Sequence, residues 1–163
     1  MNAVDFSSVR YPTYSRSACS PAIAEDLEGL VLAAPGEVDL SARAYVPICG
    51  AYRLRHSVLK TIDGSPIEQI VLNFVEQGGD RLFSFNLKPD KDQVQRPKEP
   101  GRSPDPAAAA PGPAVADDYF VKGYFNIDAL TFYTQFPRDA GHWVVYAVLK
   151  SYKSNSVEIK VQP

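Results

Sequence analysis

The sequence predicts an all-β protein in which two antiparallel sheets pack face to face as a sandwich of seven or eight strands. Apolar and polar residues alternate with a period of two in several separate stretches, which is the pattern of half-buried strands. Turn-forming residues separate these stretches at short intervals. The 163 residues are 45% hydrophobic, which suits one domain with a substantial core.

The N-terminal part of the chain is expected to form an arm that precedes the sandwich. Residues 1–28 are interpreted as an N-terminal arm, and residues 29–163 as the sandwich domain. Residues 1–19 mix serine, tyrosine, arginine and proline without a clear period. They therefore predict an extended arm or a disordered lead-in.

The first two strands are expected at residues 29–33 and 37–46. The first contains the compact apolar run Leu-Val-Leu, although Ser20 and Pro21 could instead cap and begin a short helix just before it. The second has the clearest half-buried alternation in the chain. Pro47 is expected to end the ladder of this strand or to mark an edge, because proline has no N–H to donate.

A hairpin is expected in the middle of the chain. Residues 51–54 could resume pairing after Gly50, where the glycine would suit a bulge. Residues 70–75 alternate, a Gln-Gly-Gly-Asp turn follows at 77–80, and residues 83–87 alternate again. A glycine-rich turn between two alternating runs predicts an antiparallel pair.

Residues 88–118 break the strand pattern and hold seven of the 14 prolines. The alanines near the end of this stretch favour helix, but the flanking prolines would cut a helix short. The composition therefore predicts a long Pro/Ala-rich mobile loop inserted within one sandwich. A linker between two domains is the weaker interpretation, because neither half alone has enough strands.

The last third of the chain predicts three more strands. Residues 119–127 alternate, and the aromatic residues 130–136 would continue that strand or form a short helical turn. The alternating runs 143–149 and 157–161 are joined by the polar link 151–156, which predicts an antiparallel hairpin. The inward set of the first run, which begins with tryptophan, is apolar throughout and should face the core.

The seven residues from Asp139 to Val145 read Asp-Ala-Gly-His-Trp-Val-Val. They resemble the Asp-x-Gly-x-Tyr-x-Cys signature of immunoglobulin variable-type domains, in which a tight turn leads into a strand and an aromatic ring plugs the corner. Trp143 replaces the tyrosine and Val145 replaces the cysteine, so no disulfide can form there. The resemblance implies an immunoglobulin-like or fibronectin type III-like sandwich, and it implies nothing about the ligand.

Charge and hydrophobicity exclude two classes of partner. The net charge is −2 with both signs mixed, so no nucleic-acid partner is expected. No apolar run is long enough to span a bilayer, so no membrane insertion is expected.

The location of the protein is less directly indicated. Cys19 and Cys49 could form a disulfide, which would suit an oxidising compartment, or could be two unrelated thiols. The first ten residues lack the charged and apolar regions of a signal peptide. A periplasmic or secreted location is nevertheless the working hypothesis.

No catalytic, cofactor or metal site is predicted. His56 and His142 have no nucleophile motif around them, and together with the two cysteines they show no zinc spacing. The aspartates around the proline-rich loop lack the glycine and the remaining ligands of a calcium loop. The simplest interpretation is that these side chains are exposed to solvent and form no site.

The sequence therefore favours a non-catalytic β-sandwich module that mediates protein–protein interaction in an exported or envelope setting. A carbohydrate-binding module and an enzyme with an unrecognised site are the alternatives. Exposed tyrosines can stack on sugars or anchor a protein partner, and recognition often lies on loops. The candidate binding residues are Tyr133, Tyr152, Lys153 and Asn155.

Overall fold

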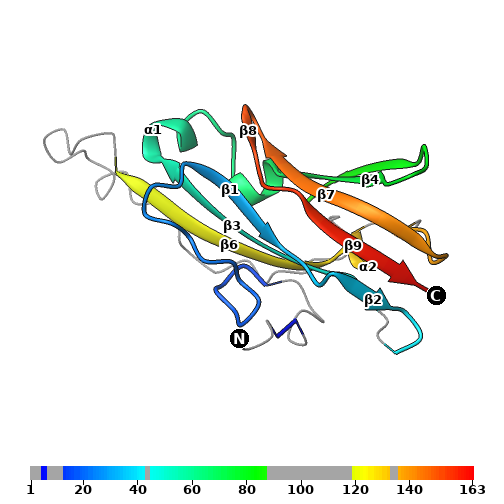
Figure 1. Cartoon of the computed structure of the whole chain (residues 1–163). Coiled ribbons are helices and arrows are strands. Elements are labelled where there is room, and N and C mark those ends of the chain that lie inside the picture. Colours follow the sequence, from blue (N-terminus) through cyan, green and yellow to red (C-terminus); the bar gives the residue numbers. More distant parts are fainter. Residues whose placement is uncertain (1–4, 7–12, 43–44, 88–118, 133–135) are drawn as a thin grey trace, which may run out of the picture.

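Two β-sheets pack together in a sandwich-like arrangement (Figure 1), as the alternation predicted. The computed structural model describes residues 5–6, 13–42, 45–87, 119–132 and 136–163. The predicted insertion at 88–118 lies outside these described residues. The strands are β1 (Gly29–Ala33), β2 (Glu37–Asp39), β3 (Pro47–Arg55), β4 (Val71–Glu76), β5 (Leu82–Asn86), β6 (Phe120–Asp128), β7 (Gly141–Leu149), β8 (Tyr152–Lys153) and β9 (Val157–Gln162), and the short helices are α1 (His56–Leu59), the 3-10 turn η1 (Pro66–Gln69) and α2 (Ala129–Phe132).

The strand order departs from a purely antiparallel sandwich of seven or eight strands. The described residues form a sheet of three strands, β1-β3-β6, and a sheet of six, β2-β9-β7-β4-β5 with β8 pairing β7. In the second sheet, β2 runs parallel to β9, so the predicted antiparallel arrangement was wrong at this edge. Alternation shows which face of a strand is buried, but it carries no information about the direction of the partner strand.

The predicted strand at 37–46 is much shorter than expected. Strand β2 ends at Asp39, because the N–H and the hydroxyl of Ser41 both donate to the Asp39 carboxylate, at 2.9 and 2.6 Å. Such a bond to a residue two positions on forms a local turn that competes with the ladder. The prediction for Pro47 was also wrong, because this proline begins β3, where its missing N–H interrupts no established ladder.

Strand β3 pairs without interruption from Pro47 to Arg55 with β6, so the predicted bulge at Gly50 is absent. Gly50 instead lies directly opposite Phe125, and Tyr52 lies opposite Gly123. A Cβ atom on Gly50 would lie 2.0 Å from the Phe125 ring, and one on Gly123 would lie 2.2 Å from the Tyr52 ring. Each aromatic ring therefore covers the backbone of a facing glycine.

The space that Gly50 leaves can be tested by adding one methyl group. We expect Gly50→Ala to lower the free energy of unfolding by about 1–3 kcal/mol, because the Phe125 ring must move and the core is closely packed. Gly36→Ala is the matched control, since nothing lies within 4 Å of a Cβ atom there. Urea denaturation of both variants measures the difference, and equal stability of the two would contradict the glycine–aromatic pairing.

The core between the sheets follows the predicted inward sets. Trp143, Val145, Ala147 and Leu149 of β7 are all buried, as the alternation of this strand predicted. The Trp143 ring lies 5.4 Å from Phe83 and 6.0 Å from Phe136, centroid to centroid. The predicted hairpins β4–β5 and β7–β9 are both confirmed as antiparallel, and the aromatic stretch after β6 begins as the short helix α2.

The described part of the N-terminal arm packs against the three-stranded sheet, and no helix is present at residues 20–28. A disulfide joins Cys19 to Cys49 on β3, which decides between the two alternatives for the cysteines. Asn126 of β6 is fully buried under the arm. Its side-chain amide donates to the Thr13 hydroxyl and to the Ser15 carbonyl, at 2.9 and 2.8 Å.

Removal of the disulfide should release this arm. We expect the double variant Cys19→Ala and Cys49→Ala to lose about 3–4 kcal/mol of unfolding free energy, because the bridge closes a loop of 30 residues in the unfolded chain. Limited proteolysis should then cut within residues 13–28 sooner than in the oxidised protein. Unchanged stability and an unchanged cleavage pattern would show that the arm is held without the bridge.

Candidate functional site

The described residues contain no group of three histidine, cysteine, aspartate or glutamate side chains placed to hold a metal ion. The His142 ring lies on β7 and pairs with Glu158 at 3.4 Å, whereas the His56 ring stacks on Tyr119 at 4.6 Å. Cys19 and Cys49 are bonded to each other, so neither provides a free thiol. No helix in the described part of the chain has the length and apolar character required to cross a bilayer.

Asp128 is the one buried carboxyl among the described residues, and its contacts are structural. Burial raises its pKa, while hydrogen bonds from neighbouring groups partly offset that effect. One oxygen accepts from the backbone N–H groups of Val46 and Leu130, at 2.9 and 3.0 Å, and the other accepts from the Thr131 hydroxyl at 3.2 Å. Asp128 thus caps α2 and joins it to the start of β3.

An open groove of about 680 Å³ lies beside β2, and its walls include Asp5, Glu37 and Asp39. Gln162 donates a hydrogen bond to Glu37, and Ser41 donates two to Asp39. Hydrogen bonds from Ser41 hold the pKa of Asp39 below its usual range. Two of these carboxylates are therefore satisfied by groups of the chain itself.

The corner before β7 is held by an arginine. Arg81 makes a two-pronged contact with Glu76, at 2.9 and 2.8 Å, and its other nitrogen lies 3.1 Å from Asp139. Its guanidinium lies 5.1 Å from the Trp143 ring. The buried indole nitrogen of Trp143 has no hydrogen-bond partner among the described residues, so this ring closes the corner without a hydrogen bond from its indole nitrogen.

The predicted binding residues separate into different environments. Tyr133 lies outside the described residues. The Tyr152 hydroxyl donates to Glu28 at 3.0 Å, and the Asn155 side chain accepts from and donates to the backbone of Leu32, at 2.7 and 3.1 Å. Tyr152 and Asn155 thus tie the second sheet to β1 and the residues just before it. Lys153 lies 4.4 Å above the Tyr146 ring, at the border of an outward surface.

This surface, which we name the apolar face, lies on the outer side of β4, β5 and β7. The strand registers align its side chains in cross-strand rows, with Val75 between Leu82 and Val144, and with Asn73 between Ser84 and Tyr146. The exposed fractions of Leu82 and Val75 are 61% and 36%, and the other members on β4 and β7 are half-buried. The members are Val71, Asn73, Val75, Leu82, Ser84, Val144, Tyr146 and Val148.

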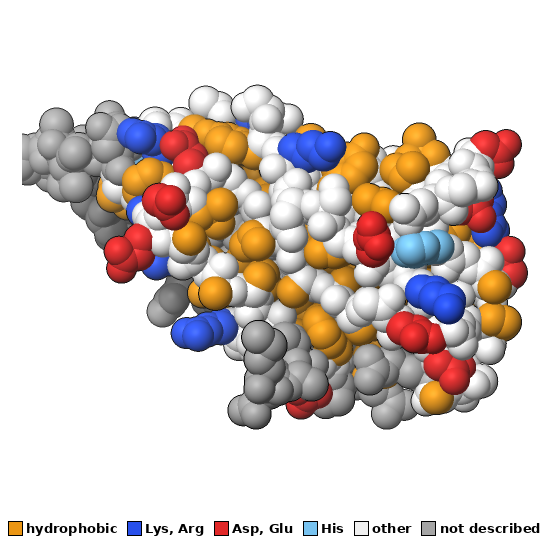
Figure 2. All heavy atoms as spheres, in the orientation of Figure 1, with side chains coloured by type: hydrophobic (Ala, Val, Ile, Leu, Met, Phe, Trp, Pro, Cys, Tyr) orange, Lys and Arg blue, Asp and Glu red, His pale blue; other side chains and the backbone are white. Residues whose placement is uncertain are grey.

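A charged border adjoins the apolar face along β9 and β2. Glu158 and Lys160 point outward opposite Val144 and His142, and Glu37 lies opposite Lys160 on the parallel strand. Figure 2 shows charged side chains gathered over β9 and β2, and hydrophobic ones beyond them, over β7 and toward β4. Exposed apolar side chains bordered by polar ones are typical of surfaces that bind proteins.

The sequence analysis missed most of the apolar face. One signal was available in β7, because both sides of this strand are apolar. Its outward residues are Val144, Tyr146 and Val148, and its inward residues are apolar as well. The neighbouring valines of β4 become part of one surface only through the register of the three strands.

Comparison with known proteins adds nothing to this site. No protein-family model matches the chain, and no curated protein sequence is significantly similar to it.

The Arg81 contacts predict an acid dependence of stability. Hydrogen bonds from Arg81 hold the pKa of Glu76 and of Asp139 below their usual range. The stability that these two carboxylates contribute is therefore fully present above their ordinary pKa of about 4. It is lost as the pH falls through the lower pKa values that they have in the folded protein.

We expect Arg81→Gln to be less stable than the wild type at pH 7, and to lose less stability between about pH 5 and pH 3. Thermal unfolding at several pH values measures this, with Arg16→Gln, a substitution of an exposed arginine, as the control. Parallel pH curves for wild type and Arg81→Gln would show that these contacts carry no net stability.

Proposed function

We propose that the chain is a non-catalytic, immunoglobulin-like sandwich module that binds a folded protein partner through the apolar face. The fold part of the proposal is supported by strand order. The order β1-β3-β6 in the first sheet agrees with strands A, B and E of a variable-type immunoglobulin domain. The order β5-β4-β7-β9 in the second sheet agrees with its strands C′, C, F and G. The Asp139–Val145 segment then leads into strand F, where its resemblance requires it.

The observation that carries the functional proposal is the row pattern on the outer side of the six-stranded sheet. Three neighbouring strands present valine, leucine and tyrosine side chains that remain partly in water. Apolar area that stays in contact with water is unfavourable, and a partner that covers it gains free energy. The surface is a sheet face rather than a pocket, so it suits a second protein surface better than a small molecule.

Lys153 belongs to this proposal, because its ammonium group lies over the Tyr146 ring at the border of the apolar face. Tyr152 and Asn155 support the face indirectly by holding the β7–β9 link against β1. The disulfide supports an exported location, because such bridges persist in oxidising compartments.

The proposal predicts that a charge placed in the centre of the apolar face abolishes binding. We expect Val144→Glu and Tyr146→Glu each to reduce capture of the partner by at least about tenfold, because an unpaired carboxylate would be buried in an apolar interface. Both side chains point away from the core, so the fold should persist, but Val144→Glu places a second carboxylate opposite Glu158 and should lower the melting temperature more than Tyr146→Glu does. The assay is quantitative affinity capture from the source proteome with the immobilised oxidised chain, followed by titration of the captured protein.

Ser57→Glu is the matched control, since it adds the same side chain at an exposed position in α1, outside the apolar face. It should bind as the wild type does. Sedimentation at increasing concentration tests whether the partner is a second copy of this chain, in which case Val144→Glu should abolish a wild-type dimer. If every protein captured by the wild type is retained by both glutamate variants, the apolar face is not the binding surface.

A further inference from the structure

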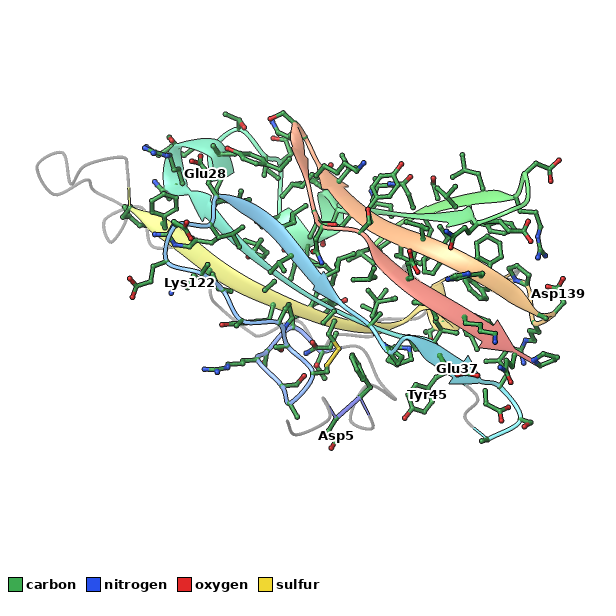
Figure 3. The ribbon with its side chains drawn as sticks, in the orientation of Figure 1. Asp5, Glu28, Glu37, Tyr45, Lys122 and Asp139 are labelled. Atoms are coloured by element: carbon green, nitrogen blue, oxygen red, sulfur yellow. A yellow bond between two sulfur atoms is a disulfide. The ribbon has the colours of Figure 1, made fainter. Side chains whose placement is uncertain are left out.

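A second outward surface lies on the three-stranded sheet, and it differs in character from the apolar face. Arg53 of β3 and Lys122 of β6 are directly opposite each other in the antiparallel register. Two like charges in such a pair repel each other and destabilise the sheet. Figure 3 places Lys122 and Glu28 at the same end of the sandwich, away from Asp139 and Glu37.

The charges of this pair are not neutralised within the part of the chain that the structure describes. Among the described residues, neither Arg53 nor Lys122 has a carboxylate within ion-pair distance. The nearby Glu28 is engaged by Arg55 at 3.4 Å and by the Tyr152 hydroxyl at 3.0 Å. A net-acidic chain thus keeps two cations side by side, at a cost that a bound anion would remove.

Arg53 is held in place before any ligand arrives. One guanidinium nitrogen donates to the Leu27 carbonyl at 2.7 Å, and the guanidinium carbon lies 3.5 Å from the centre of the Phe120 ring. The side chain is therefore ordered, and binding at this site requires less loss of conformational entropy. A guanidinium with donors in a fixed plane is suited to carboxylate and sulfate groups.

An aromatic ring stands next to the two cations on the same outer face. Tyr124 follows Lys122 by two residues on β6, so their Cα atoms are separated by roughly 7 Å. Its cross-strand neighbour is Ala51, beyond which lies Val31 on β1. Tyr124 is half-buried and does not belong to the core cluster. The Tyr124 side chain is therefore partly exposed on the outer side of the sheet.

We propose that Arg53, Lys122 and Tyr124 form a site for an acidic sugar, in which the two cations bind a carboxylate or sulfate group and the tyrosine stacks on the sugar ring. An acidic peptide would use the cations but not the aromatic face. Two cations are too few for a nucleic-acid backbone. This site is on the opposite sheet from the apolar face, so the two proposals can fail independently.

The test is isothermal titration calorimetry on the full oxidised chain with four hexamers as probes: a sulfated hexasaccharide, a uronic acid hexasaccharide, a neutral glucose hexasaccharide and hexaglutamate. We expect both acidic sugars to bind, and the neutral sugar and the peptide to bind at least about tenfold more weakly. Raising the salt concentration from about 50 to 300 mM should weaken the acidic sugars several-fold, because their contacts are charged and exposed.

The variants identify the surface. Lys122→Gln should weaken both acidic sugars about tenfold, and Tyr124→Leu should weaken them several-fold, whereas the matched control Lys160→Gln on the other sheet should leave them unchanged. Lys122→Gln should also retain the protein partner that Val144→Glu loses. Three results would each overturn the acidic-sugar site. The first is that either acidic sugar fails to bind, and the second is that Lys122→Gln binds these sugars as the wild type does. The third is that hexaglutamate binds equally well and that Tyr124→Leu leaves its binding unaffected.

Discussion

The register between β3 and β6 is the constraint on which the rest of the molecule depends. Two successive inward pairs match a glycine with an aromatic ring, Gly50 with Phe125 and Tyr52 with Gly123. A slip of one residue would turn both rings out of the core, so these pairs hold the alignment. The same alignment also sets the outer side of these two strands. It places the disulfide beside Asn126, a residue that the arm buries, and it brings together Arg53 and Lys122, the two cations of the proposed sugar site.

The two outer faces of the sandwich offer different chemistry on one rigid scaffold. The face of β4, β5 and β7 is apolar with a charged border, whereas the face of β3 and β6 carries cations beside an aromatic ring. Most other polar side chains discussed above are used internally: Asp128 caps α2, Arg81 holds the β4–β5 hairpin to the turn before β7, and Asn126 anchors the arm. If the two sheet faces act in recognition as proposed, the polar groups between them serve the structure.

The binding residues selected from sequence show how far such reasoning reaches. Tyr152 and Asn155 were chosen because they lie in a polar link, but their partners, Glu28 and Leu32, are more than 120 residues earlier in the chain. No local pattern predicts a contact of that separation. Lys153 was chosen on the same grounds, and it borders an exposed surface only because β8 folds back on β7. The valines of the apolar face were overlooked because each is unremarkable alone, and they form a surface only when three strands align.

The sequence by itself determined where most strands lie and which side of each strand faces the core, because a side-chain period of two requires only local information. It also determined the β4–β5 and β7–β9 hairpins, whose links are short enough to leave one choice of partner. Only the tertiary structure decided that β2 crosses to the second sheet and runs parallel to β9, that Cys19 bonds to Cys49, and which outward faces remain uncovered. These features depend on segments far apart in the chain, and their free energy arises from burial and pairing between strands rather than from the preference of any one strand.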